Sequence, residues 1–207
     1  MLQNINKELL LSLNSLMEYD FIQTIVKIFS DSPIFFIPVF LVVLWLYYTY
    51  KKGTPIISEI HFTKNLLEKE KLMYIFYSIV LWILVSLTIQ KFVHIDRPGS
   101  VIRWVWILIM NHLPDASFPS DHATVSVAFL TSLFLAWYKK TWLYYTPFVI
   151  LMLLSRVIVW VHWPFDIIAG TIVWFTSSFI TFKYITNIKF LIKFNHIIIK
   201  ILRFIKL

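Results

Sequence analysis

Two long stretches without a charged side chain constrain this chain more than any other feature of its sequence. Residues Ser32 to Tyr50 and Leu72 to Gln90 contain no Asp, Glu, Lys or Arg. A helix of ~20 mostly apolar residues is long enough to cross a bilayer. Over the whole chain 59% of the residues are hydrophobic, above the ~45–50% of a soluble domain. The sequence therefore predicts an integral membrane protein.

Further apolar stretches complete the predicted bundle: Ala123 to Tyr138, Thr141 to Val161 and Ile167 to Phe182. Trp and Tyr gather near their ends, which is typical of the membrane interface. We predict one all-α domain over residues 1–207, a polytopic bundle with five transmembrane helices. A sixth is added if the segment from residue 4 to residue 30 also crosses.

Within this domain, residues 1–30 are expected to form one or two N-terminal helices, and residues 31–186 the transmembrane core. Residues 187–207 place their basic side chains on one helical face and Ile and Leu on the other. This pattern predicts a basic amphipathic helix on an anionic membrane surface. Trp104 to Leu113 is too short to span and predicts a re-entrant or interfacial segment.

The Lys and Arg residues fall unevenly on the two sides of five spans. Six lie on one side (Lys7, Lys27, Lys91, Arg97, Arg103 and Arg156), and the other 13 of the 19 lie opposite. Because cytoplasmic loops are rich in Lys and Arg, we expect the C-terminus in the cytoplasm and the six facing outward. Topology and contact with membrane lipids thus account for the net charge of +8, and nucleic acid is not an expected partner.

The outward side also carries a cluster of ionisable residues near His162. Arg156 lies at the end of one predicted span, and ionisable groups at membrane depth are costly and usually functional. Pro164 favours a helix end near His162 and a new helix with Asp166 in its first turn. Asp166 could then hold one ring nitrogen of His162 and leave the other as a nucleophile. Taken alone, a capping Asp beside an interfacial His is the simpler explanation.

The segment Ser117-Phe118-Pro119-Ser120-Asp121-His122 precedes a long apolar run and predicts a helix N-terminus. Such an end binds anions, although an ordinary cap explains the segment equally well. Ser120 could donate to a phosphate oxygen and His122 could act as an acid. Phosphoryl transfer needs mainly positive charge around the oxygens, which Lys91, Arg97 and Arg156 would supply. The chain has no Gly-rich nucleotide loop, so no nucleotide is expected.

Taken together, these residues resemble the signature of the type 2 phosphatidic acid phosphatase superfamily, whose fold and site are shared with vanadium haloperoxidases. That signature is Lys-x6-Arg-Pro, Pro-Ser-Gly-His and Ser-Arg-x5-His-x3-Asp. The resemblance runs from about Leu72 to Phe182. The matching residues, in chain order, are Arg97, Pro98, Pro119, Ser120, His122, Ser155, Arg156, His162 and Asp166.

Two positions depart from this pattern. Lys91 lies six residues before Arg97 instead of seven, and Gln90 fills the usual position. Asp121 replaces the usual Gly. The resulting Ser-Phe-Pro-Ser-Asp-His sequence is similar to that of the bacitracin-resistance-type undecaprenyl-diphosphate phosphatases.

The resemblance implies hydrolysis of undecaprenyl diphosphate to undecaprenyl phosphate, with no metal and no cofactor. In this scheme His162 forms a phosphohistidine, Asp166 orients it, and His122 protonates the leaving group. The phosphate oxygens are held by Arg97, Arg156, Ser120 and Lys91. The resemblance and the charge distribution together place the site at the outer face of the bacterial cytoplasmic membrane. A neutral His162 and a protonated His122 predict a bell-shaped pH dependence.

Other functions fit part of the pattern. The same site could act on phosphatidylglycerophosphate, phosphatidate or lipid A, or transfer its phosphoryl group to lipid A. A transporter or metal site could be built from His94, Asp96, His112, Asp115, His122 and His162. Arg97 and Arg156 would repel a metal there, which disfavours this last hypothesis.

Overall fold

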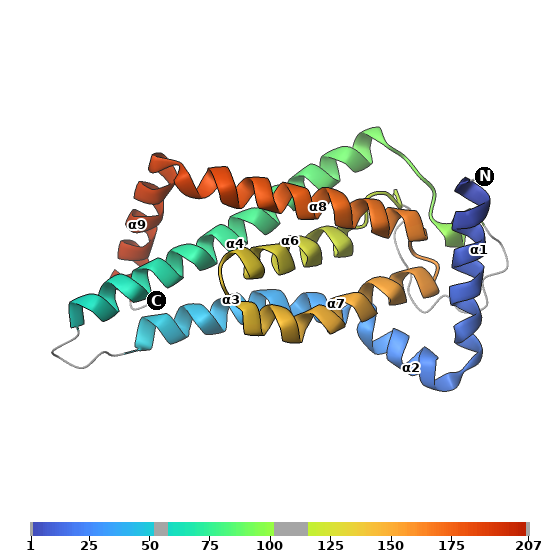
Figure 1. The fold of residues 1–207 in the computed structure, drawn as a ribbon, viewed down its shortest axis with the longest axis horizontal. Coiled ribbons are helices and arrows are strands. Elements are labelled where there is room, and N and C mark those ends of the chain that lie inside the picture. Colours follow the sequence, from blue (N-terminus) through green and yellow to red (C-terminus); the bar gives the residue numbers. More distant parts are fainter. Residues whose placement is uncertain (1, 52–57, 102–115, 206–207) are drawn as a thin grey trace.

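The computed structural model describes residues 2–51, 58–101 and 116–205, and these are built from helices, as predicted. Five helices run along the long axis of the molecule (Figure 1): α3 (Ser32–Tyr50), α4 (Ser58–Phe92), α6 (Asp121–Leu135), α7 (Lys139–Ile158) and α8 (Pro164–Tyr184). The central helix, α6, contacts the other four. Buried side chains of α6 such as Phe129 and Leu133 pack with Ile75 of α4 and Val149 of α7 to form the main core.

Four stretches are long and apolar enough to cross a membrane: Asp20–Tyr50, Lys64–Phe92, Lys139–Ile158 and Pro164–Asn187. They correspond to four of the five predicted spans, although the one predicted over Thr141 to Val161 ends earlier, at Ile158. The fifth, predicted over Ala123 to Tyr138, corresponds to α6, which has 15 residues. Its length of about 22 Å is less than the ~30 Å of a hydrocarbon core. Most of α6 is buried by its neighbours, so this helix does not need the length of a lipid-facing span.

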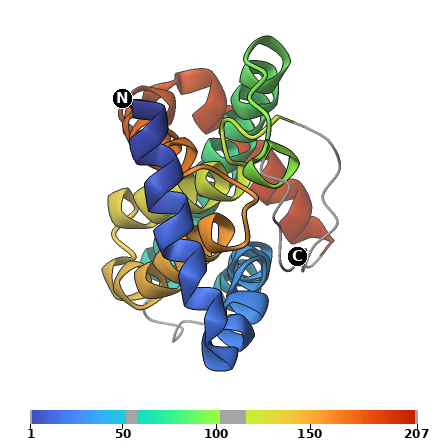
Figure 2. The ribbon, with the colours of Figure 1, turned by 90° about the vertical axis from the view of Figure 1, so that its right-hand side faces the viewer.

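Two N-terminal helices lie at one end of the bundle, where one or two were predicted (Figures 1 and 2). They are α1 (Leu2–Asn14) and α2 (Asp20–Phe29), joined by the short 3-10 helix η1 (Ser15–Glu18). In α1, Leu10 packs on Val157 and Trp160, and the Asn14 side chain donates to the Ile158 carbonyl at 2.7 Å. The N-terminal helix therefore buttresses the connection between α7 and α8.

The predicted basic helix is present as α9 (Lys189–Phe204), which follows the 3-10 turn η3 (Ile185–Asn187) at the opposite end of the bundle (Figure 1). It packs on α4 through Asn195, which accepts a 2.8 Å hydrogen bond from the Tyr77 hydroxyl. The four exposed cations of α9 are Lys189, Lys193, Lys200 and Arg203. The interfacial segment predicted over Trp104 to Leu113 lies outside the described residues.

Helix ends converge at the end of the bundle that carries α1. The N-termini of α3, α6 and α8 and the C-termini of α4 and α7 all lie there, together with the short helix α5 (Pro98–Val101) (Figure 1). Each helix N-terminus presents unpaired backbone N–H groups. This end of the bundle is where the fold can bind an anion.

Candidate active site

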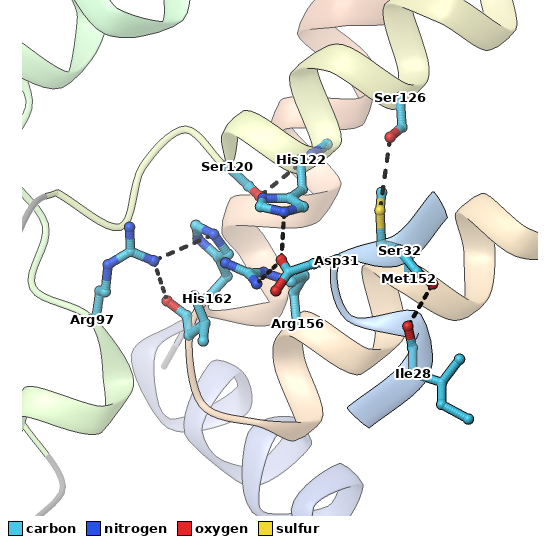
Figure 3. Close-up of polar contacts among 12 residues, drawn as sticks. Ile28, Asp31, Ser32, Arg97, Ser120, His122, Ser126, Met152, Arg156 and His162 are labelled. Carbon is cyan, nitrogen blue, oxygen red and sulfur yellow. Dashed lines mark hydrogen bonds and ion pairs between the residues drawn. The ribbon is translucent and has the colours of Figure 1, made fainter. Parts of the chain in front are cut away.

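Four of the predicted site residues come from four different segments of the chain and gather at the end of the bundle that carries α1 (Figure 3). Arg97 lies just before α5, and His122 is in the first turn of α6. Arg156 is in the last turn of α7, and His162 belongs to the connection between α7 and α8. The fold thus brings together side chains that are 65 residues apart in the sequence, Arg97 and His162.

The connection that carries His162 is shaped by the end of α7. Trp160 has a positive φ of 62°, and the backbone N–H groups of Val161 and His162 both donate to the Arg156 carbonyl, at 3.1 and 3.2 Å. This is the left-handed ending by which many helices stop. Pro164 then begins α8, as predicted. The tight ending places His162 beside the last turn of α7, which holds Arg156.

The hydrogen bonds of His162 define its tautomer. Its Nδ1 lies 2.8 Å from the Ser117 carbonyl, which can only accept, so Nδ1 carries the proton. Its Nε2 lies 3.5 Å from Nη1 of Arg97, which can only donate. Burial lowers the pKa of His162 well below its ordinary value, and the charges of Arg97 and Arg156 lower it further. The ring is therefore neutral at pH 7, with its Nε2 lone pair directed into the cluster.

Asp166 does not make the predicted contact with His162. Its Oδ2 accepts from the backbone N–H of Trp163 at 3.0 Å and from the Ser117 hydroxyl. A carboxylate in the first turn of α8 is in reach of the backbone N–H that precedes that helix, and here it caps the helix. Asp166 is connected to His162 through Ser117, whose hydroxyl it binds and whose carbonyl holds Nδ1.

Asp31 joins this cluster, although no pattern in the sequence predicted it there. It occupies the N-cap position of α3, and its Oδ1 lies 2.7 Å from Nε2 of His122 and 2.7 Å from Nη1 of Arg156 (Figure 3). The Arg156 side chain is only 1% exposed, and a buried charge requires a partner of opposite sign. In the sequence, Asp31 before Ser32 and Pro33 signals only a helix start.

Ser120 occupies the N-cap of α6, which begins at Asp121 as the sequence predicts. Its buried Oγ accepts from the backbone N–H of Ala123 at 3.4 Å. A hydroxyl that accepts in this way can still donate its own proton. Ser120 can therefore cap α6 and donate to a substrate oxygen.

Lys91 is the one predicted site residue that the structure does not bring to the cluster. It is exposed at the end of α4, and none of the described contacts joins it to the site. Successive residues of a helix are rotated by about 100° about its axis, so Lys91 and the preceding Gln90 lie on different faces of α4. Gln90 instead donates to the Pro119 carbonyl at 3.1 Å and to Oδ1 of Asp121 at 2.9 Å. The two departures noted in the signature, Gln90 and Asp121, are therefore hydrogen-bonded partners that tie α4 to the start of α6.

Arg97 is held in place by bonds between its own segment and the α7–α8 connection. Its Nη1 donates to the Val161 carbonyl at 3.1 Å. The Trp163 indole donates to the Asp96 carbonyl at 2.9 Å, and the Gly99 N–H donates to the Trp160 carbonyl at 3.1 Å. These bonds fix the guanidinium beside His162.

The residues of the metal hypothesis are not gathered in one place in the described part of the chain. His94 pairs with Asp96 at 3.4 Å on an exposed stretch, whereas His122 contacts Asp31 and His162 contacts Ser117. His112 and Asp115 lie outside the described residues. Among those described, no group of three or more His, Cys, Asp or Glu is arranged to hold a metal.

A family model described as the PAP2 superfamily matches residues 71–190, more than half of the chain. The chain belongs to the PAP2 superfamily. Arg97, Ser120, His122, Arg156, His162 and Asp166 all lie inside the matched PAP2 region. Asp31 precedes this region, so the fold adds a residue from outside the PAP2 match to the site.

Two curated relatives share part of this PAP2 sequence. The chain is 37% identical over 81 residues to YbjG of Escherichia coli (strain K12), provisionally named an undecaprenyl-diphosphatase. It is 40% identical over 86 residues to the undecaprenyl-diphosphatase of Sulfolobus acidocaldarius. These matches cover 36% and 42% of the chain, and they span only 37% and 40% of the relatives' own lengths.

A solved structure has a similar arrangement of helices. The crystal structure of Aquifex aeolicus LpxE is similar with a TM-score of 0.61, covering 87% of this chain and 96% of LpxE. At 20% identity, this similarity concerns the arrangement of the helices alone.

Proposed function

We propose that the chain is a lipid phosphatase that hydrolyses undecaprenyl diphosphate to undecaprenyl phosphate through a phosphohistidine. The observation that carries this proposal is the buried, neutral His162, whose Nε2 lone pair faces a cluster that holds Arg97, Arg156 and His122. A nucleophile surrounded by positive charge is what phosphoryl transfer requires.

In the first step, Nε2 of His162 attacks the terminal phosphorus and forms the N–P bond. The bond between this phosphorus and the bridging oxygen breaks, and its electron pair leaves with undecaprenyl phosphate. His122 donates its Nε2 proton to that oxygen. Arg97, Arg156 and Ser120 bind the equatorial oxygens, on which negative charge accumulates.

In the second step, His122 accepts a proton from a water molecule, which attacks phosphorus and releases inorganic phosphate from His162. Throughout both steps Ser117 keeps Nδ1 protonated through its 2.8 Å hydrogen bond. Asp166 acts as a positioning residue, because it holds the Ser117 hydroxyl and the backbone of Trp163 rather than the ring.

The choice of undecaprenyl diphosphate is supported by the names of the two curated relatives and by the Ser-Phe-Pro-Ser-Asp-His segment. A panel of undecaprenyl diphosphate, phosphatidylglycerophosphate and phosphatidate tests it with purified protein. Phosphate release is expected to be fastest from the undecaprenyl compound and to vanish in His162→Ala. Much faster release from phosphatidylglycerophosphate, or retained activity in His162→Ala, would show the assignment to be wrong.

The proposal places the site at the outer face of the bacterial cytoplasmic membrane, with the C-terminus in the cytoplasm. Because the chain has no cysteine, single-cysteine variants can test this directly. In intact cells, a membrane-impermeant maleimide is expected to label His94→Cys at the site end and to spare Lys139→Cys at the other end. The reverse labelling pattern would invert the topology.

A further inference from the structure

An apolar groove of about 570 Å³ runs between α3 and α7. Its lining includes Phe29, Ser32, Phe36, Lys140, Tyr145 and Phe148. This volume is within the ~300–1,000 Å³ of ligand pockets.

The groove begins beside the active site. Phe29 and Ser32, at one end of its lining, flank Asp31, whose carboxylate contacts His122 and Arg156. Figure 3 shows Ser32 next to Asp31 at the start of α3. Towards the other end of α7 the groove reaches Lys140. On α3 the lining runs from Ser32 to Phe40 and on α7 from Lys140 to Phe148, each about 12 Å of helix. The groove therefore leads away from the Asp31 end through part of the ~30 Å thickness of a hydrocarbon core.

Aromatic rings form the walls of the groove. Phe36 stacks on Tyr145 with a centroid distance of 4.8 Å, and Phe29 stacks on Phe148 at 6.0 Å. The Tyr145 hydroxyl donates to the Pro33 carbonyl, so this polar group is already occupied and the wall keeps its apolar character. Phe36 and Phe148 remain 41% and 46% exposed. Such a surface suits a flexible hydrocarbon chain.

We propose that this groove binds the isoprenoid chain of the substrate where the chain leaves its phosphate end. The inference rests on the proposed function, since that function places a lipid phosphate in the adjoining cluster. A chain that lies between α3 and α7 has its phosphate at the Asp31 end, within reach of Arg156 and His122. Groove contacts then contribute binding energy that a short, water-soluble diphosphate cannot use.

The test compares Phe36→Ala with the control variant Phe76→Ala. Phe76 is an aromatic residue of α4 that is 52% exposed and lies outside the groove. Each variant is assayed with undecaprenyl diphosphate and with isopentenyl diphosphate, which has a single isoprene unit. Phe36→Ala is expected to raise KM for the long substrate about tenfold and to leave KM for the short one unchanged. Phe76→Ala is expected to change neither. An unchanged ratio of the two KM values in Phe36→Ala would overturn the groove assignment.

A second measurement covers the case in which Phe36→Ala does not fold. A photoreactive isoprenoid diphosphate bound to the wild-type protein is expected to label peptides of α3 and α7, and labelling of α4 and α8 alone would overturn the proposal. Inactivity of the wild type towards both diphosphates would instead overturn the proposed function, and this inference with it.

A second inference comes independently from the ion pairs of Asp31. Its Oδ1 lies at hydrogen-bonding distance from both His122 and Arg156. In the proposed reaction, Nε2 of His122 and the guanidinium of Arg156 bind substrate oxygens instead. We infer that Asp31 is a competing counter-ion, which the substrate phosphate displaces from between His122 and Arg156. The carboxylate thereby sets the affinity of the site for phosphate groups.

Inorganic phosphate serves as the probe for this role. Asp31→Asn removes the competing charge while keeping the side-chain shape, so the inhibition constant for phosphate is expected to fall about tenfold. The matched control Asp96→Asn changes an exposed carboxylate and is expected to have no effect. A fall in kcat with an unchanged or higher inhibition constant would overturn the inference, since Asp31 would then only position His122. The inhibition constant is independent of the fraction of folded protein, and Asp31→Ser repeats the test if Asp31→Asn does not fold.

Discussion

The lowered pKa of His162 makes a prediction about stability as well as about rate. The ring is 2% exposed, and its pKa is held well below 6.5 by burial and by Arg97 and Arg156. In the unfolded chain the ring binds a proton near pH 6.5, whereas in the folded chain it does not. As the pH falls below 6.5, the unfolded state therefore binds more protons and gains stability. The free energy of unfolding should fall by about 1.4 kcal/mol per pH unit until the folded-state pKa is reached.

His162→Asn removes this proton uptake and isolates the contribution of one residue. The free energy of unfolding is measured by denaturant titration in detergent micelles at a series of pH values below 7.5. The difference between wild type and His162→Asn should change by about 1.4 kcal/mol per pH unit below pH 6.5 and stay constant above it. His94→Asn, which changes a histidine that is 69% exposed, serves as the control. Parallel curves for wild type and His162→Asn would show that His162 titrates normally and would refute the argument.

The same reasoning applies to catalysis. If His162 is the nucleophile, as proposed, its neutrality below pH 6.5 places the acid limb of kcat/KM below that value. Arg97→Gln removes one cause of the lowered pKa of His162, so the limb is expected to move to higher pH as the rate falls. An acid limb that stays in place in Arg97→Gln would mean that another group controls it.

Three further predictions concern two contacts around the cluster and the metal-free scheme. Ser117→Ala removes the hydroxyl that Asp166 binds and is expected to lower kcat about tenfold with little change in KM; an equal rise in KM would point to substrate binding instead. Gln90→Ala and Asp121→Ala, measured singly and together by thermal unfolding, are expected to be non-additive by about 1 kcal/mol, because their side chains share one hydrogen bond. Additive effects would mean that the 2.9 Å contact contributes nothing. Excess EDTA is expected to leave kcat unchanged, and a loss that added divalent metal restores would contradict the metal-free scheme.

Most of the site could be predicted because its residues lie at helix ends that the sequence marks clearly. Pro164 marks the start of α8 and Ser120 marks the start of α6. These two helix starts place His162 and His122 at the same end of the bundle. Long apolar runs likewise predicted the four helices that can cross a membrane. The length of α6 was close to the prediction, since the apolar run from Ala123 to Tyr138 has 16 residues and the helix has 15. Its predicted role as a span was less secure, because hydropathy alone cannot distinguish a helix buried in protein from one that faces lipid.

Contacts between distant segments were the part that the sequence could not supply. Asp31 meets Arg156 across 125 residues, and nothing near Asp31 in the sequence distinguishes it from an ordinary helix cap. Asp166 has several partners in reach, and the choice of Ser117 over His162 depends on how the segment before α6 packs. The exclusion of Lys91 from the cluster follows from a rotation of 100° about α4, which spacing suggested but could not decide.

The left-handed residue that ends α7 has a consequence for engineering this protein. Trp160 adopts a φ of 62°, a conformation that costs a residue with a side chain about 1–2 kcal/mol and that glycine adopts freely. Its indole packs on Leu10 and Val157, so the N-terminal helix holds in place the bend that positions His162. Replacing Trp160 with glycine would relieve the backbone but remove this buried side chain, and truncating a buried Trp costs about 3–5 kcal/mol. The lost packing exceeds the relieved strain, so engineering for thermal stability should keep Trp160 despite its strained backbone.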